Sequence, residues 1–459
     1  MHNVAQRGEH VCVHTSARAV TPPDSPVVYT RTAVSTGAND PFQALREMLV
    51  RETRRCVRPP VGRFRHPWLA PMPPRDSTPD GRWADDNRFA IGDYAGGLFH
   101  HDVSESAIEN CRDAELAEAS FGSLLCFLDC AEPNGCIHRI ELPHRVRDPE
   151  PAKPVMAQLA LRAIDGIDDG LARAERHRVL PRLLAFVDHL ERRTTGLHGL
   201  LLTASARASG FDSDVLTAGL PENSVEGPDT NTFMVLEYRA LAELARRLGD
   251  DATAATLVEK ANALAQRIDE LLWHEPAHTY VALRWRHGAA QQRDELVGHY
   301  DPDGVWRPLA SWISLLPLIA GIPGVDRAAA LLDALLDPQR YWGPAGVRTV
   351  PLDDPFFQQA ARVMIYDPRR GERGPVSNWS GPVWILASFY MFRALQLHGR
   401  RSEARELALR TAKTLADDLR TTGMLHENYD DSGHGLWPRR GTFLSWNVLA
   451  TTMLREAGE

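Results

Sequence analysis

Residues 231–249 read NTFMVLEYRALAELARRLG and carry the clearest structural signal in the chain. Their apolar residues recur at helical spacing along one stripe: Met234, Leu241, Leu244, Ala245 and Leu248. This pattern predicts a helix with one buried face. Gly249 ends the helix, and Asp250 opens a second one that runs to Trp273. Because only a very short turn joins them, the two helices must pack antiparallel.

The same pairing of helices recurs along the chain. Three further hairpins are predicted, with helices at residues 154–171 and 175–193, 308–320 and 326–336, and 383–397 and 402–419. Single helices are predicted at 113–130 and 442–455, and weaker ones at 43–56 and 101–111. The hairpins are spaced too widely for a solenoid with a repeat of about 34 residues. They suit a closed all-α ring of six hairpins, each with an inner and an outer helix.

The rest of the chain sets the domain limits. No convincing strand-like alternation and no G-x-G-x-x-G or Walker pattern is present, which disfavours an α/β phosphate-binding fold. Residues 1–40 are polar and contain proline, and we interpret them as a flexible N-terminal arm. Residues 59–81 are dense in proline and predict an extended loop rather than a packed element. Residues 41–459 are then expected to form one domain.

Composition excludes several classes of function. Of 459 residues, 43% are hydrophobic and 24% charged, the values of a globular protein, and the net charge of -8 predicts no nucleic-acid partner. The N-terminus has no apolar signal region, and the longest strongly apolar run, 313–322, is interrupted by Pro317. We therefore expect a soluble, cytoplasmic protein without a membrane partner. The oligomeric state is left open.

Cysteine and histidine spacing gives no standard metal motif. All six cysteines lie in the first 136 residues, without a C-x-x-C pair: Cys12, Cys56, Cys111, Cys126, Cys130 and Cys136. Cys126 and Cys130 are one helical turn apart, with His138 just beyond Cys136, so a metal site is conceivable, but buried reduced thiols are favoured. His100, His101 and Asp102 form a compact polar cluster that either lines the pocket or lies on the surface, and a metal site is the least favoured interpretation because two adjacent histidines on a loop point in different directions. No metal and no cofactor is expected.

Three loop segments contain residue types suited to acid–base chemistry or to ligand binding. Residues 209–214, SGFDSD, place Asp212 among small residues, where burial can raise a carboxyl pKa as a general acid requires. Residues 427–433, ENYDDSG, place Glu427 beside an aromatic residue. Residues 378–384, NWSGPVW, offer two indoles as platforms for sugar rings or cations. Taken singly, each segment has an ordinary alternative: a turn or cap, a solvated acidic loop, and core tryptophans.

Together, and in this order on a helical chain, these segments resemble the inverting α-glycosidases with an (α/α)6 barrel. That clan comprises the processing glucosidases of glycoside hydrolase family 63, the mannosylglycerate and glucosylglycerate hydrolases and, more distantly, the trehalases. Its motifs S-G-x-D-(N/S)-S, W-R-G-P-V-W, E-x-Y-(D/N)-P-x-(T/S)-G and F-x-W-S read here SGFDSD, NWSGPVW, ENYDDSG and FLSWN. DAELA at 113–117, NGCIH at 134–138 and WGPAGVR at 342–348 extend the resemblance over roughly residues 91–455.

The resemblance implies a fold, a reaction and site residues. The fold is an (α/α)6 barrel, and the reaction is inverting hydrolysis of a small α-glucoside or α-mannoside. Asp212 becomes the general acid, with Asp214 as second choice, and Glu427 the general base. An inverting pair should lie about 6.5–9.5 Å apart. Three tryptophans become candidates for sugar stacking or for shaping the pocket: Trp379, Trp384 and Trp446.

The first loop at the mouth of the ring departs from the family pattern. Where the family has W-D-S, residues 93–102 read DYAGGLFHHD. We expect Tyr94, His101 and Asp102 to contact substrate, with Asp102 in the role of the sugar-gripping aspartate.

Further departures point to an altered substrate. Lys153 stands where the family has a sugar-binding glutamine, and Ser380 where it has an arginine. Arg307 opens a predicted inner helix and is a candidate for binding a substrate carboxylate. These residues favour a modified substrate, such as one with an acidic aglycone near Lys153.

The same departures allow an alternative in which the scaffold has been diverted to a lyase, cyclase or isomerase. A mainly apolar pocket would favour that reading, whereas convergent hydrogen-bonding groups would favour a sugar. A binding protein with a dead site is disfavoured because Asp212 and Glu427 are retained.

Overall fold

The computed structural model describes residues 40–73, 96–196, 198–205, 208–212, 214–217, 220–284, 295–300, 303–357, 379–437 and 442–459. All of them belong to one unit, Ser35–Glu459. The predicted N-terminal arm and Tyr94 fall outside the described residues, apart from Asp40 at the end of the arm.

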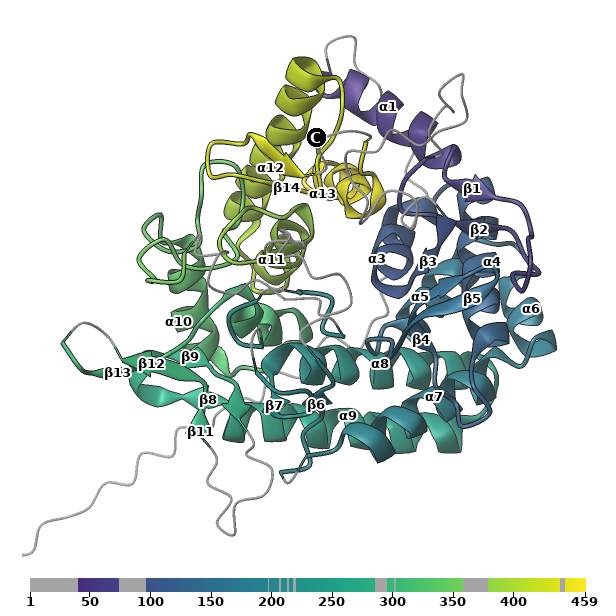
Figure 1. The fold of residues 1–459 in the computed structure, drawn as a ribbon, viewed down its shortest axis with the longest axis horizontal. Coiled ribbons are helices and arrows are strands. Elements are labelled where there is room, and N and C mark those ends of the chain that lie inside the picture. The colour runs from purple at the N-terminus through teal and green to yellow at the C-terminus, as the bar shows by residue number, and fades with distance from the viewer. Residues whose placement is uncertain are drawn as a thin grey trace, which may run out of the picture. The chain divides into compact units, whose positions relative to one another are not determined.

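Six elements form a closed inner ring (Figure 1). In chain order these are α3 (His100–Asn110), α5 (Met156–Asp165), α8 (Pro228–Arg247), the 3-10 helix η2 (Trp312–Ala320), α11 (Ile385–Leu397) and α13 (Leu449–Glu456). Each element packs against the next, and α13 packs against α3, which closes the ring.

Seven of the described helices lie outside this ring. They are α1 (Gln43–Arg54), α4 (Ala114–Cys130), α7 (Val179–Thr194), α9 (Asp251–Leu271), α10 (Val325–Leu336), α12 (Arg401–Thr422) and the short α6 (Gly170–Arg176), which precedes α7. Outer and inner elements alternate along the chain: α4 packs on α5, α7 and α9 on α8, α10 on η2, and α12 on α11 and α13. The predicted (α/α)6 barrel is confirmed.

The hairpin of α8 and α9 shows why the sequence folds this way. Pro228 starts α8, where its missing N–H costs nothing, and the predicted stripe from Met234 to Ala245 is buried. The Asp250 side chain accepts the Thr253 N–H at 3.0 Å and caps α9. The apolar face of α9 is buried against α8, as the periodicity predicted.

Short strands, which the sequence did not predict, connect the helices. An antiparallel sheet joins β3 (Leu98–Phe99), β4 (His138–Leu142) and β5 (Arg145–Pro151). A second, in the order β11-β10-β7-β6, joins Glu295–Leu296, Leu283–Arg284, Val225–Glu226 and Leu202–Thr203. Four strand pairs remain: β1 (Val57–Arg58) with β2 (Trp68–Leu69), β8 (Trp273–His274) with β9 (Thr279–Tyr280), β12 (Gly298–Tyr300) with β13 (Trp306–Pro308), and β14 (Asn428–Tyr429) with β15 (Gly435–Trp437). The 3-10 turns η1 (Glu275–Ala277) and η3 (Ser445–Val448) complete the list.

Two local predictions were wrong. The described part of the proline-rich segment is packed, because its Phe64, Trp68 and Met72 side chains are buried in the core. Gly122 of α4 permits this contact, since a Cβ there would lie 1.9 Å from the Pro67 carbonyl oxygen. The inner element after residue 308 begins only at Trp312 and is a 3-10 helix, with Pro317 inside it. None of the described helices is long and apolar enough to cross a membrane.

Candidate active site

Three buried or half-buried carboxyl groups gather inside the ring. Asp102 lies in the first turn of α3, Asp212 in the loop between β6 and β7, and Glu427 directly before β14. Burial raises the pKa of Glu427 well above its ordinary value, and the Asp102 and Asp212 carboxylates raise it further. Burial also raises the pKa of Asp102 to about 7, and Asp212 adds to that shift. The three groups are therefore within electrostatic reach of one another.

One cation joins this carboxyl cluster. Arg139 of β4 donates from Nη1 to Asp212 Oδ1 at 3.3 Å. The Arg139 charge also lowers the pKa values of Asp102 and His101, although burial remains the largest influence on both. Arg139 was not predicted from the sequence. The one feature that could have indicated it is its position directly after the family-like segment NGCIH at residues 134–138.

A residue near the C-terminal end of the sequence holds the Asp102 side chain in place. Ser445 Oγ, at the start of η3, donates to Asp102 Oδ1 at 2.7 Å. His101 is also buried, and its pKa is lowered well below the ordinary value by burial, by Lys153 and by its neighbour His100. The imidazole is consequently neutral at pH 7. His101 and Asp102, which the sequence places at the junction of the first mouth loop and a weak helix, lie in the first turn of that helix.

Asp214 occupies a different position from Asp212. Its Oδ1 accepts the Leu216 N–H at 2.9 Å and the Ser311 hydroxyl at 3.0 Å. Burial raises the Asp214 pKa to about 7, with Asp229 and Lys153 as its charged neighbours. Asp214 therefore connects the loop to η2, whereas Asp212 joins the cluster that contains Glu427.

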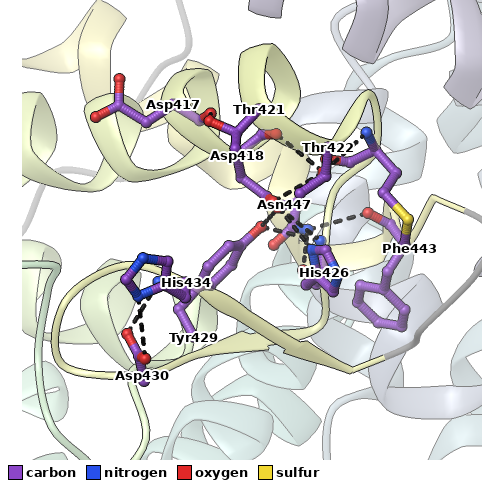
Figure 2. Close-up of polar contacts among 11 residues, drawn as sticks. Asp417, Asp418, Thr421, Thr422, His426, Tyr429, Asp430, His434, Phe443 and Asn447 are labelled. Atoms are coloured by element: carbon purple, nitrogen blue, oxygen red, sulfur yellow. Dashed lines mark hydrogen bonds and ion pairs between the residues drawn. The ribbon is translucent and has the colours of Figure 1, made fainter.

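The Glu427 segment is held by a buried polar network around Asp418 of α12 (Figure 2). Asp418 Oδ2 accepts the His426 Nδ1–H at 2.8 Å, the Tyr429 hydroxyl at 3.0 Å and the His426 N–H at 3.2 Å. Asn447 Nδ2 donates to the His426 carbonyl at 2.7 Å. Tyr429 also exchanges two backbone hydrogen bonds with Val383, directly before α11. Both sides of Glu427 are thereby anchored.

We expect Asp418→Asn to destabilise the protein and to lower activity together. An amide cannot accept all the hydrogen bonds that the carboxylate accepts, and each bond to a charged group contributes about 1.5–3 kcal/mol. A loss of about 2 kcal/mol or more in the free energy of unfolding, measured by denaturant titration, is the expected result. The neighbouring Asp417, which pairs with the exposed Lys413 and Arg420, provides the control. Asp417→Asn should change the same free energy by less than about 0.5 kcal/mol.

Aromatic side chains form one wall beside the carboxyl cluster. Trp379 stacks on Trp384 with ring centroids 3.8 Å apart and on Trp312 at 5.5 Å. Trp446 is almost fully buried against Trp384 and His101. Trp379 and Trp384 are completely buried and stack on each other, so neither ring has an exposed face in this structure.

A second polar cluster lies around Lys153. Lys153 Nζ is 3.8 Å from Asp229 Oδ2 and 3.6 Å from the centroid of the Phe211 ring. Burial lowers the Lys153 pKa to about 8, while Asp229, Glu105 and Asp214 act to raise it. Acidic groups of the chain itself therefore surround this cation. That environment opposes the predicted acidic aglycone at Lys153, since a further anion would meet three carboxyl groups.

The Lys153 cluster offers several hydrogen-bonding atoms. Within the described part of the chain, Lys153 Nζ, both carboxylate oxygens of Asp229 and both ring nitrogens of His101 have no hydrogen-bond partner. Two small cavities lie beside single members of these clusters, one lined by Asp102 and Ser445 and the other by Lys153. The lining of both cavities is mainly apolar, and neither is lined by Asp212 or Glu427. The unpartnered polar atoms of the Lys153 cluster are therefore the feature that favours a sugar over an apolar substrate.

Arg307 is not part of either cluster of buried side chains. It lies exposed on β13, where it pairs with His299 in the β12–β13 hairpin. The predicted inner helix begins later, at Trp312, which explains the difference. Ser380, at the family's arginine position, is fully buried.

The comparisons with known proteins agree with this architecture. A crystal structure of the GH63 mannosylglycerate hydrolase from Thermus thermophilus in complex with glucose matches 90% of this chain and 99% of its own, with a TM-score of 0.59 and 19% identity. Neutral trehalase from Saccharomyces cerevisiae matches 86% of this chain and 74% of its own, with a TM-score of 0.55 and 13% identity.

Sequence relatives point the same way. A probable mannosyl-oligosaccharide glucosidase from Schizosaccharomyces pombe (strain 972 / ATCC 24843) is 25% identical over 261 residues, which is 54% of this chain. This chain spans only 29% of that relative. The family model of the mannosylglycerate hydrolase MGH1-like glycoside hydrolase domain matches residues 124–446. The chain therefore belongs to the MGH1-like glycoside hydrolase domain family.

Proposed function

We propose that the protein is an inverting α-glycoside hydrolase of a small α-glucoside or α-mannoside, with Asp212 as general acid and Glu427 as general base. The observation that carries the proposal is the mutual coupling of Asp102, Asp212 and Glu427 inside the barrel. The named relatives, a glucosidase and a hydrolase crystallised with glucose, support this class of sugar.

The reaction is a single displacement. Asp212 donates its proton to the glycosidic oxygen as the bond to the anomeric carbon breaks, and Arg139 interacts with the carboxylate that remains. Glu427 takes one proton from a water molecule, whose oxygen bonds to the opposite face of that carbon. The product sugar therefore carries the inverted configuration. A gap of about 6.5–9.5 Å between the two carboxyl groups would accommodate that water.

The environment of Glu427 suits a general base. Its raised pKa makes the carboxylate a stronger proton acceptor than an exposed glutamate, as long as the pH leaves it ionised. Asp102 contributes one of the charges that raise this pKa. We further propose that Asp102 and the Lys153 cluster exchange hydrogen bonds with sugar hydroxyl groups. The acidic neighbours of Lys153 support a neutral sugar over an anionic one.

The test is a panel of α-linked and β-linked glucosides and mannosides, with the anomer of the first product followed by ¹H NMR. Release of a β-sugar from an α-glycoside is the expected result. Release of the α-anomer would contradict the inverting mechanism alone. Absence of turnover on every glycoside would contradict the hydrolase assignment and favour the alternative of a lyase, cyclase or isomerase.

The pH dependence offers a further prediction. Asp102→Asn removes a negative charge that raises the Glu427 pKa, so this pKa should fall. The acid limb of kcat/KM reports a base that must be deprotonated in the free enzyme. We therefore expect the limb to move toward lower pH.

Asp250→Asn is the matched control, because Asp250 caps α9 on the outer layer and asparagine caps helices equally well. Its acid limb should stay in place. An unmoved limb in Asp102→Asn would show that Glu427 does not set the acid limb.

A further inference from the structure

A compact group of metal-ligating side chains lies between α4 and β4, apart from the carboxyl cluster. Glu132, Cys136 and His138 each offer one ligand atom, and these atoms all lie within 4.8 Å of one another. Cys136 and His138 are buried, whereas Glu132 is exposed. The group is therefore accessible from solvent on the Glu132 side.

The backbone fixes this group. The Glu132 N–H donates to the Cys136 carbonyl at 2.9 Å, and the Asn134 side chain accepts the Cys136 N–H at 2.9 Å. Gly135 adopts a left-handed conformation with φ of +91°, and a Cβ there would lie 2.3 Å from the Ala185 carbonyl oxygen of α7. Only glycine fits this position, and the tight turn holds the Glu132 and Cys136 side chains together.

A buried carboxylate orients His138. His138 Nδ1 lies 2.8 Å from Glu141 Oε1, and Arg63 donates to Glu141 Oε2 at 2.6 Å. Metal-binding histidines almost always place their second nitrogen against such a carboxylate, which directs the other nitrogen to the ion. Here that other nitrogen, Nε2, faces Glu132 Oε1 at 3.0 Å.

A second histidine approaches from α7. His189 is nine-tenths buried, and among the described residues its Nε2 has no hydrogen-bond partner. Ala185 of α7 lies against Gly135 of the turn, and His189 stands four residues further along the same face of that helix. His189 is not among the three residues whose ligand atoms lie within 4.8 Å of one another, so its ring would have to move to become a further nitrogen ligand.

We propose that Glu132, Cys136 and His138 bind one zinc ion, with His189 or water completing the coordination. Zinc binds thiolate, imidazole and carboxylate ligands alike, and around a tetrahedral zinc the ligand atoms lie about 3.5 Å apart. The observed spacing requires only a small shift, and the exposed Glu132 side chain has room to make it. An ion pair of His138 with its two glutamates is the competing reading, but it gives no role to the buried thiol.

The ion would connect the end of α4 to the first residue of β4. Arg139, the next residue of β4, donates to Asp212. A zinc ion at this turn would therefore act as a structural element that fixes the strand from which Arg139 reaches the carboxyl cluster. The site does not depend on the proposed reaction, because its ligands are separate from Asp212 and Glu427.

The test uses the full chain after removal of metals with a chelator. Titration with Co²⁺, as a spectroscopic substitute for zinc, should give one equivalent of binding with a near-ultraviolet thiolate-to-cobalt band, and excess Zn²⁺ should abolish that band. Zn²⁺ should also raise the thermal midpoint of the apoprotein. No band, or no more than background binding, would overturn the proposal.

Variants distinguish this site from the other thiols. Cys136→Ser should abolish the band, whereas Cys130→Ser, which changes a thiol next to Arg63, should keep it. Glu132→Gln alters an exposed side chain and leaves the core intact, and it should weaken Zn²⁺ binding by about 100-fold. Glu118→Gln, an exposed glutamate of α4, is its control. A band that survives Cys136→Ser, or equal affinity in both glutamate variants, would contradict the assignment whether or not the protein cleaves glycosides.

Discussion

Replacing Glu427 with glutamine is expected to lower kcat by about 10²–10⁴-fold without lowering the stability of the barrel. The amide has the shape of the carboxyl group but cannot take a proton from water. Glu427 is almost fully buried, and its pKa lies well above the ordinary value. Above the ordinary pKa of a glutamate, this group therefore makes the folded protein less stable relative to the unfolded chain, and glutamine removes that cost.

The sign of the stability effect follows from linkage. A carboxyl group whose pKa is raised by folding stabilises the protein below its unfolded-state pKa, and this contribution is lost as the pH rises through the folded-state pKa. The free energy of unfolding of Glu427→Gln should therefore fall less steeply with rising pH over that interval than that of the unsubstituted protein. Denaturant titrations at several pH values, together with single-turnover kinetics, measure both effects.

Glu237 is the matched control, since it is another fully buried glutamate. Burial raises its pKa to about 7, but its Oε1 accepts the Ala157 N–H at 2.6 Å at the start of α5. Glu237→Gln should therefore lose stability and keep most of its kcat. If Glu427→Gln behaved like Glu237→Gln, Glu427 would have a structural role and the proposed general base would be wrong.

The helices were predictable because their signals are local. The stripe of α8, the Asp250 cap and the glycine between the two helices lie within one short stretch of chain, and tertiary packing only reinforces them. The strands could not be predicted, since most are two residues long and show no alternation. The burial of Trp68 could not be predicted from its own segment. It requires a glycine at position 122 of α4, where a side chain would collide with the backbone of Pro67.

Residues of the candidate site could be predicted only where they lie within a segment that resembles a family motif. Asp212 and Glu427 were identified by the segments around them, and their coupling agrees with that choice without establishing their roles. Arg139 and Asp418 carried no motif of their own, because their importance comes from contacts made across the ring. The acidic neighbours of Lys153 likewise come from α3, α8 and a loop, so its charge balance could not be inferred from position 153 alone.

Asp212→Asn should separate the two chemical roles through the choice of leaving group. An alkyl glycoside needs a proton on its departing oxygen, and loss of the acid should slow its hydrolysis by about 10²–10⁴-fold. The fluoride ion of an α-glycosyl fluoride leaves without being protonated, so hydrolysis of this substrate should be far less affected by the substitution. The measurement is kcat/KM for the alkyl glycoside divided by kcat/KM for the fluoride, in the variant and in the unsubstituted protein. A lower ratio in the variant shows that Asp212 protonates the leaving group.

Asp214→Asn is the matched control, because it removes a carboxylate from the same loop and leaves the proposed acid, Asp212, in place. Asp214 accepts hydrogen bonds from Leu216 and Ser311, so its replacement should lower stability and affect both substrates equally. A preference for the fluoride in Asp214→Asn, but not in Asp212→Asn, would transfer the acid role to Asp214. Equal losses on both substrates in Asp212→Asn would instead mean that its contact with Arg139 positions the site and that the proton comes from another group.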